Sequence, residues 1–208
     1  MNVPFFPNPD DTHCFQACLR SVLKYFRFAE EYNWNSLEEL SGKRPGKWTW
    51  PLHAISQLYK VGFQAEIISN FDYSKFIENP NEYLLSILGA ELALQQVENS
   101  DIFYEVEVAR KYSSLAGTPK IPSIEDLKAF HQRGFLTICN VNLPQLYGES
   151  GYLGHFVIPT AIGNDSIVFH DPGIQTNQFP PRENSTVAVE QFKQAWASSN
   201  FVVGFKDK

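Results

Sequence analysis

The residues best suited to chemistry in this sequence are a cysteine near the N-terminus and a histidine and an aspartate in the last third. Cys14 follows the segment NPDDTH and opens a stretch of apolar residues at helical spacing, which predicts a helix over residues 14–28. A helix N-terminus carries about half a positive charge and lowers the pKa of a thiol placed there. Cys14 is therefore a candidate nucleophile.

His155 and Asp171 belong to two predicted strands, HFVIPTAI and SIVFHD, which the hairpin signal GND separates. If Ile162 pairs with Ser166 across a three-residue loop, Asp171 lies opposite Val157 and diagonally across from His155 on one face. A two-residue loop would place the two side chains on opposite faces. Both faces of these strands are apolar, so the pattern permits the first register without requiring it.

These three residue types together are suited to nucleophilic catalysis. A thiolate attacks a carbonyl carbon, an imidazole transfers protons, and a carboxylate orients the imidazole. His13 is a rival base by its proximity to Cys14 in the sequence, but adjacent residues at a helix entrance point in different directions. Taken one at a time, the residues also have structural interpretations that stay open. His155 would then be a histidine packed within a strand, and Asp171 a turn residue before proline.

The elements that must position these residues change in character along the chain. Its first part is mainly helical in pattern, with a second helix from Pro51 towards Gly62, a short strand over 64–69 and a helical block over 72–113. The last third adds a helix over 123–132, the strands FLTICNV and FVVGF around the hairpin, and the helix VAVEQFKQAWA. This order predicts an α+β fold with a mostly antiparallel sheet. The length of 208 residues indicates one domain over 1–208, with 70–120 as a helical elaboration.

The composition excludes several classes of protein. A net charge of −6 disfavours nucleic acid as a partner. The sequence contains no run of 18 apolar residues, so we expect no membrane span. The N-terminus, MNVPFFPNPDD, does not resemble a signal peptide. Three cysteines without a secretion signal indicate reduced thiols in the cytoplasm. A mature form that had lost its leader would have the same sequence, so a secreted effector stays open.

Neither a metal nor a cofactor is expected. Cys14 and Cys18 are four residues apart and lie near His13, but no second cluster of ligands accompanies them. Cys18 and Cys139 fit the core better. Trp48 and Trp50 either line a substrate cleft or pack beside the start of the second helix.

Three stretches of the sequence resemble the peptidase C39-like group of the papain-like cysteine peptidase superfamily. They are NPDDTHCFQACLRSVLKYF, GYLGHFVIPTAIGNDSIVFHDPG and, more weakly, KWTWPLHAISQLYKVGF, and they cover about a third of the chain. The resemblance implies a papain-like α+β fold in which N-terminal helices pack on a mostly antiparallel sheet. It also implies Cys14 as nucleophile, His155 as base and Asp171 as the orienting carboxylate.

The resemblance has two departures. It places Asn8, six residues before Cys14, where the family has the glutamine of its oxyanion hole. Asparagine offers the same amide donor on a shorter arm. Phe15 stands where family members commonly have glycine, and its side chain narrows the site.

The function that follows is thiol-dependent hydrolysis of a peptide or amide bond through a thioester, with a peptide or another amide as substrate. Two alternatives stay open. An acyl or aminoacyl transferase would use the same three residues and a different acceptor. A catalytically silent binding module would keep the fold alone, and Asn8 and Phe15 favour it.

Overall fold

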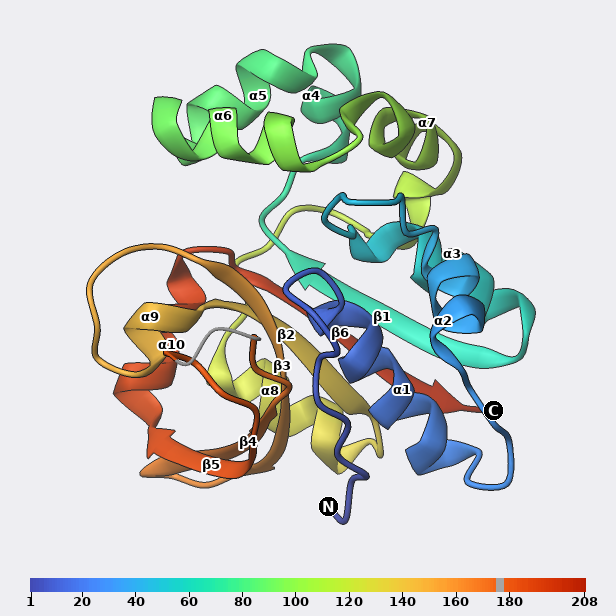
Figure 1. Cartoon of the computed structure of the whole chain (residues 1–208), viewed down its shortest axis with the longest axis vertical. Coiled ribbons are helices and arrows are strands. Elements are labelled where there is room, and N and C mark those ends of the chain that lie inside the picture. Colours follow the sequence, from blue (N-terminus) through green and yellow to red (C-terminus); the bar gives the residue numbers. More distant parts are fainter. Residues whose placement is uncertain (175–177) are drawn as a thin grey trace.

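The centre of the molecule in this computed structural model is an antiparallel sheet with helices on both faces (Figure 1). The structure describes residues 1–174 and 178–208. Within them, the strand order is β1-β6-β2-β3-β4-β5 and every neighbouring pair is antiparallel. The strands are β1 (Phe63–Ser69), β2 (Leu136–Asn142), β3 (Gly154–Ile162), β4 (Ser166–Asp171), β5 (Arg182–Ala188) and β6 (Phe201–Asp207). The predicted α+β fold is confirmed.

The helices divide between the two faces of the sheet and a separate group. One hydrophobic core joins α1–α3 to the sheet and a second joins α8–α10 to its other face. Successive residues of β3 alternate between these cores, since Phe156 contacts the first and Val157 the second. The helices are α1 (Cys14–Phe26), α2 (Trp34–Ser41), α3 (Pro51–Lys60), α4 (Tyr73–Glu78), α5 (Pro80–Leu88), α6 (Ala90–Asn99), α7 (Ile102–Tyr112), α8 (Ile124–Gln132), α9 (Leu143–Leu146) and α10 (Val189–Ala197). In the described part of the chain, none of them has the length and apolarity that a membrane crossing requires.

Most helix boundaries follow from local signals. Pro51 occupies the first turn of α3, and Gly62, just beyond its end, has a φ of +99° that favours glycine. Ser123 and Asp126 form the expected capping box of α8. The elements α2, α9 and β5 were not predicted from the sequence. The last of these is an edge strand of polar sequence, RENSTVA, which is held by its pairing with β4.

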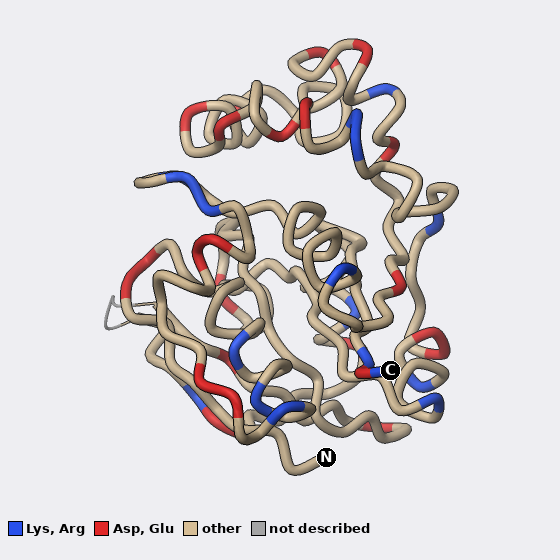
Figure 2. Tube along the Cα trace, turned by 90° about the vertical axis from the view of Figure 1, so that its right-hand side faces the viewer, with Lys and Arg blue, Asp and Glu red and all other residues tan. Residues whose placement is uncertain are grey.

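Helices α4–α7 form a lobe beside the sheet, which occupies the top of Figure 1. The lobe has its own hydrophobic cluster, in which Phe76 and Leu84 pack against Val106 and Ala109. Acidic and basic residues are interspersed over the lobe and the sheet body (Figure 2). The helical block predicted over 72–113 is thus present. Its status as an elaboration within a single domain over 1–208 stays a prediction.

The β3–β4 hairpin contains a bulge that sets the register of the site. Near the turn Ile162 pairs with Ile167, so the expected pairing of Ile162 with Ser166 is wrong. One extra residue of β3, Thr160, then shifts the pairing, so that Ile158 pairs with His170. The bulge follows Pro159, whose nitrogen cannot donate a ladder hydrogen bond. At this end of the hairpin the register is the one that puts Asp171 and His155 on a common face.

Glu105 gives the lobe a pH-dependent stability. The side chain is only 6% exposed, and burial together with the nearby Asp101 raises its pKa from 4.5 to about 8. In the unfolded chain the carboxyl ionises near its ordinary pKa, so the folded state binds the extra proton between these values. The contribution of Glu105 to stability is therefore absent at low pH and grows unfavourable as the pH rises towards 8.

We expect Glu105→Gln to raise the free energy of unfolding at pH 8 by roughly 2–4 kcal/mol relative to wild type, and far less at pH 4.5. Urea denaturation at both pH values measures the two differences. Glu98→Gln, at an exposed position of α6, is the matched control and should change little at either pH. A gain from Glu105→Gln that is equal at both pH values would contradict the buried titration.

Candidate active site

His155 and Asp171 form a buried hydrogen-bonded pair at the ends of adjacent strands. His155 begins β3 after Gly154, and Asp171 is the last residue of β4. The distance from His155 Nε2 to Asp171 Oδ1 is 2.8 Å, and the residues are 1% and 0% exposed. The expected proximity of these two side chains is confirmed.

Two further donors surround the Asp171 carboxylate. The backbone N–H of Gly173 donates to Oδ1 at 2.7 Å, and the Tyr147 hydroxyl donates to Oδ2 at 2.6 Å. Burial by itself would raise the pKa of Asp171, but these hydrogen bonds and the charge of His155 bring it below 3.8. The carboxylate is therefore ionised and fixed in orientation at neutral pH.

Cys14 lies against His155 at the entrance of α1. Burial raises the pKa of a thiol, but the hydrogen bond to His155, the imidazolium charge and backbone donors together lower the pKa of Cys14 below 9.0. Burial also opposes protonation of His155, but its hydrogen bonds to Asp171 and Cys14 raise its pKa to about 10. Both directions favour a thiolate beside an imidazolium at neutral pH.

Asn8 lies beside the site and holds the N-terminal segment in place. Its Nδ2 donates to the Gly173 carbonyl at 3.0 Å, and its backbone N–H donates to the Pro172 carbonyl at 2.8 Å. Its Oδ1 accepts the backbone N–H of His13 at 3.2 Å, at the start of α1. Asn8 is buried and is not among the residues that line the cavity described below. Its expected role as oxyanion donor stays a prediction.

The other histidines and cysteines near the site have different neighbours. His13 lies between Asp10 and Glu38, with a distance of 2.7 Å on each side. His170 donates from Nε2 to the Val3 carbonyl and accepts the Asn184 N–H at Nδ1. Cys18 and Cys139 belong to the two cores, where burial raises the pKa of both thiols. Over residues 1–174 and 178–208, no three His, Cys, Asp or Glu residues form a group suited to a metal ion.

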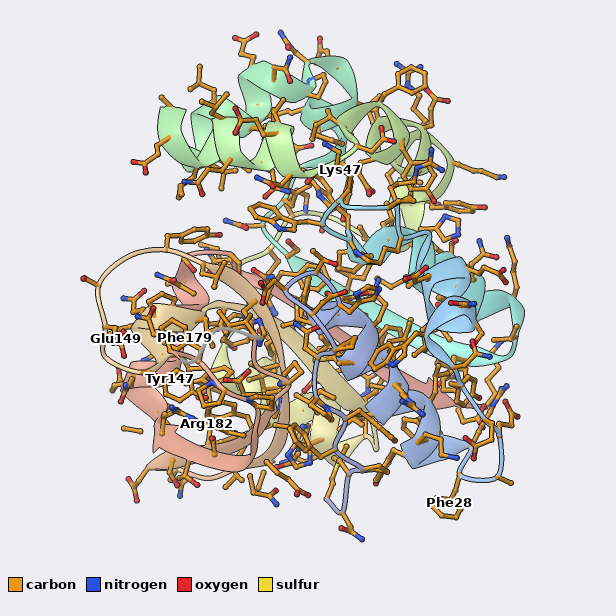
Figure 3. The ribbon with its side chains drawn as sticks, viewed as in Figure 1. Phe28, Lys47, Tyr147, Glu149, Phe179 and Arg182 are labelled. Carbon is orange, nitrogen blue, oxygen red and sulfur yellow. The ribbon has the colours of Figure 1, made fainter. Side chains whose placement is uncertain are left out.

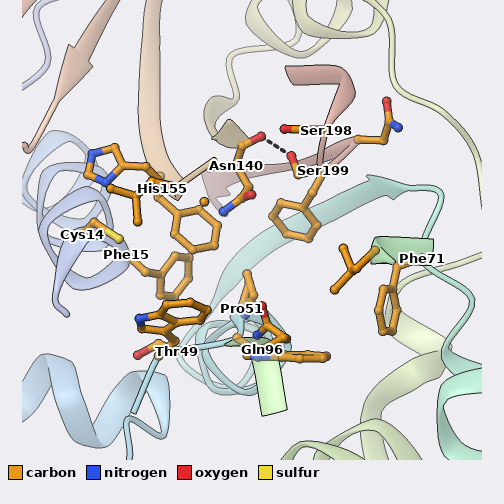
Figure 4. A pocket seen from close by; sticks show the side chains of 18 of the residues that line it. Cys14, Phe15, Thr49, Pro51, Phe71, Gln96, Asn140, His155, Ser198 and Ser199 are labelled. Atoms are coloured by element: carbon orange, nitrogen blue, oxygen red, sulfur yellow. Dashed lines mark hydrogen bonds between the residues drawn. The ribbon is translucent and has the colours of Figure 1, made fainter. Parts of the chain in front are cut away.

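A cavity of about 320 Å³ opens beside Cys14 and His155 and extends to the lobe. Figure 4 shows Cys14 and His155 at one end and Phe71 at the other, with Asn140 between them. Trp48 and Trp50 both line it, as one of the two interpretations of the sequence expected. Cys14, which is partly exposed, therefore lines an open cavity.

Sequence reasoning missed Tyr147. It follows α9, outside the elements that the sequence predicted, and no spacing rule connects it to Asp171. The structure stacks its ring on Phe179 and places the Arg182 guanidinium 4.1 Å from the ring centre. Figure 3 shows these labelled side chains gathered at the same side of the sheet. The sequence offered no stronger signal than an aromatic residue with a polar end.

The fold resembles that of a solved peptidase domain over its whole length. The peptidase domain of Streptococcus ComA, described as a bi-functional ABC transporter involved in a quorum-sensing pathway, matches with a TM-score of 0.52 and 16% identity, covering 100% of both chains. This chain has the papain-like fold of C39 peptidase domains. The structure of a C39-like peptidase from Bacillus anthracis has a TM-score of 0.49 and 16% identity, covering 100% of this chain and 96% of the other. No protein-family model matches the sequence, and neither does any curated protein.

We expect Tyr147→Phe to lower the free energy of unfolding at pH 7 by about 1.5–3 kcal/mol, because an ionised, buried carboxylate loses a donor. The pKa of Asp171 then rises towards its ordinary value. A carboxyl with a lowered pKa stabilises the fold above its unfolded pKa and loses this effect as the pH falls through its folded pKa. The midpoint of acid unfolding should therefore move to higher pH, which circular dichroism measures.

Tyr152→Phe is the matched control for Tyr147→Phe. The Tyr152 hydroxyl makes no hydrogen bond with another side chain or the backbone in the described residues, although Tyr152 also lines the cavity. Its replacement should leave the acid midpoint in place. An equal shift in both variants would show that Tyr147 acts through packing and not through its hydrogen bond to Asp171.

Proposed function

We propose that this chain is a thiol-dependent hydrolase that cleaves a peptide or amide bond, with Cys14, His155 and Asp171 as its catalytic triad. The arrangement of a partly exposed Cys14 against the buried His155–Asp171 pair, at the end of an open cavity, carries this proposal. The directions of the pKa shifts support it, because they favour the charge states that nucleophilic attack requires. The C39 peptidase fold supports the class of reaction.

The mechanism follows from the roles of these groups. The Cys14 thiolate attacks the carbonyl carbon and forms a tetrahedral intermediate with an oxyanion. The His155 imidazolium gives its proton to the departing amine as the carbon–nitrogen bond breaks, which leaves a thioester on Cys14. Water then attacks the thioester and gives a proton to His155, and the acid leaves with the thiolate restored. Asp171 keeps the imidazole oriented throughout.

Two donors are assigned to the oxyanion in this mechanism. The first is the backbone N–H of Cys14, at the first turn of α1. The second is the side-chain amide of Asn8, which corresponds to the family glutamine by its spacing. The bonds of Asn8 to Gly173 and His13 keep this amide beside the helix entrance. The free state of all three cysteines supports a reducing compartment, the cytoplasm, as the place of action.

We expect wild-type protein, incubated with a proteome-derived peptide mixture in H₂¹⁸O, to generate new carboxyl termini that carry ¹⁸O. Cys14→Ala should generate none above background and should keep the wild-type circular dichroism spectrum, because the thiol contributes to chemistry more than to the core. Mass spectrometry of the peptides measures both. New amides formed only when an amine acceptor is added would identify an acyl transferase instead. Identical peptide profiles for wild type and Cys14→Ala would support the silent binding module.

Asn8→Ala tests the oxyanion assignment. Removal of one oxyanion donor typically lowers kcat by about 10²–10³, while the iodoacetamide alkylation rate of Cys14 should stay within about twofold because the donor acts on the transition state. Asn8→Gln should keep most of the turnover. Asn8→Ala also loses the contacts to Gly173 and His13, which lowers the stability of the fold whether or not Asn8 is the donor. The deciding measurement is therefore kcat under conditions where the variant is fully folded. A kcat within about twofold of wild type excludes Asn8 as the donor.

A further inference from the structure

The cavity beside Cys14 changes in chemistry along its length. Near Cys14 its wall includes His155, Asp11 and Thr12, and further along it includes the neutral polar residues Asn140 and Asn200. The end formed by the lobe and the chain leading into it is mostly apolar and aromatic, with Asn70 and Gln96 as its neutral polar residues. Its apolar and aromatic residues are Trp50, Phe71, Tyr73, Leu84, Ile87 and Leu88.

The apolar end is held in position from both sides. The segment before α3 is tied to the end of α6, since the Trp48 N–H donates to the Asn99 carbonyl at 2.6 Å and Trp50 Nε1 donates to Ser100 Oγ at 3.1 Å. The chain that leaves the lobe is bonded to the chain that enters it, since the Lys120 N–H donates to the Ser69 carbonyl at 2.8 Å. The ring of Phe71 packs at 5.6 Å from that of Trp50. The lobe and the sheet body therefore present one preformed space.

The charges around this space exclude an acidic ligand group. Among the described residues that line it there is no lysine or arginine, and the only carboxylate, Asp11, belongs to the Cys14 end. An anion placed among Phe71, Leu84 and Ile87 would lose its hydration without gaining a cationic partner. An alkyl or aromatic group there would gain free energy from burial in proportion to its apolar area.

We infer that the lobe end of this cavity is a substrate subsite for a bulky, uncharged apolar group, which the substrate carries on the chain that extends from the bond cleaved at Cys14. Ile87 on α5 is its most readily tested wall. The side chain lines the cavity and is 47% exposed, so it is open to a ligand and contributes little to the core. The inference names a substrate class for the proposed function. It rests on that function, because it takes the Cys14 sulfur to be the reacting atom.

The experiment uses N-substituted iodoacetamides on the full chain. The Cys14 thiolate displaces iodide from the CH₂–I carbon and forms a thioether, so no turnover or further reactant is needed. N-hexyl-iodoacetamide is compared with N-(5-carboxypentyl)-iodoacetamide, which has a similar chain ending in a carboxylate. Mass spectrometry gives the alkylation rate of Cys14, and each rate is divided by that of glutathione with the same reagent.

We expect the normalised rate of the hexyl reagent to exceed that of the carboxypentyl reagent by about tenfold or more and to saturate with concentration. Ile87→Asp should remove most of this preference. Leu85→Asp is the matched control, because Leu85 lies on the same helix, is 51% exposed and does not line the cavity. It should keep the full preference.

The outcomes separate the two proposals. Equal normalised rates for the two reagents, or a preference that survives Ile87→Asp, would overturn the apolar subsite. The preference is a ratio within one protein, so it reports on the cavity even if Cys14 reacts no faster than glutathione. A slow Cys14 with both reagents would count against the activated nucleophile of the proposed function, while the ratio would still decide the subsite.

Discussion

The buried hydrogen bond between His155 and Asp171 constrains much of the surrounding structure. A charged pair removed from water is costly unless its remaining donors and acceptors are satisfied. Asp171 meets this requirement with the Tyr147 hydroxyl and the Gly173 N–H. The same carboxylate therefore holds Tyr147, just after α9, and Gly173, just after β4. Gly173 is in turn fixed to Asn8, which links the pair to the segment that leads into α1.

The bulge at Thr160 shows how a local irregularity serves this constraint. Side chains of a strand alternate between faces, so a register error of one residue would move Asp171 away from His155. Near the turn, β3 and β4 pair in a register that is shifted by one residue from the register at the site. The bulge corrects this shift before the strands reach His155 and Asp171. The Thr160 carbonyl also accepts the N-terminal ammonium at 2.9 Å. The turn and the site thus have separate registers within one hairpin.

The lobe illustrates a different division of roles. Its helices bury their own cluster, in which Glu105 is an ionisable residue with a raised pKa. Much of the outer surface of α5 and α6 is exposed, including Leu85 and Leu94. The lobe provides a wall of the cavity, since Leu84, Ile87 and Leu88 of α5 line it. The lobe therefore shapes the far end of this space, while α1 and β3 position Cys14 and His155.

The sequence by itself determined the elements whose signals are local: the helix that Cys14 opens, the capping box at Ser123, the two strands that carry His155 and Asp171, and the α+β class. It could not determine the edge strand β5, whose polar residues carry no strand period and which forms only against β4. Nor could it find Tyr147 or the direction of the Asn8 amide, because those contacts join segments that are distant in the chain. Tertiary structure decided the register at the site as well. Successive residues of β3 face two apolar cores, and β4 carries apolar residues at alternate and intervening positions. The hydrophobic pattern, which normally selects a register, was therefore equally compatible with two.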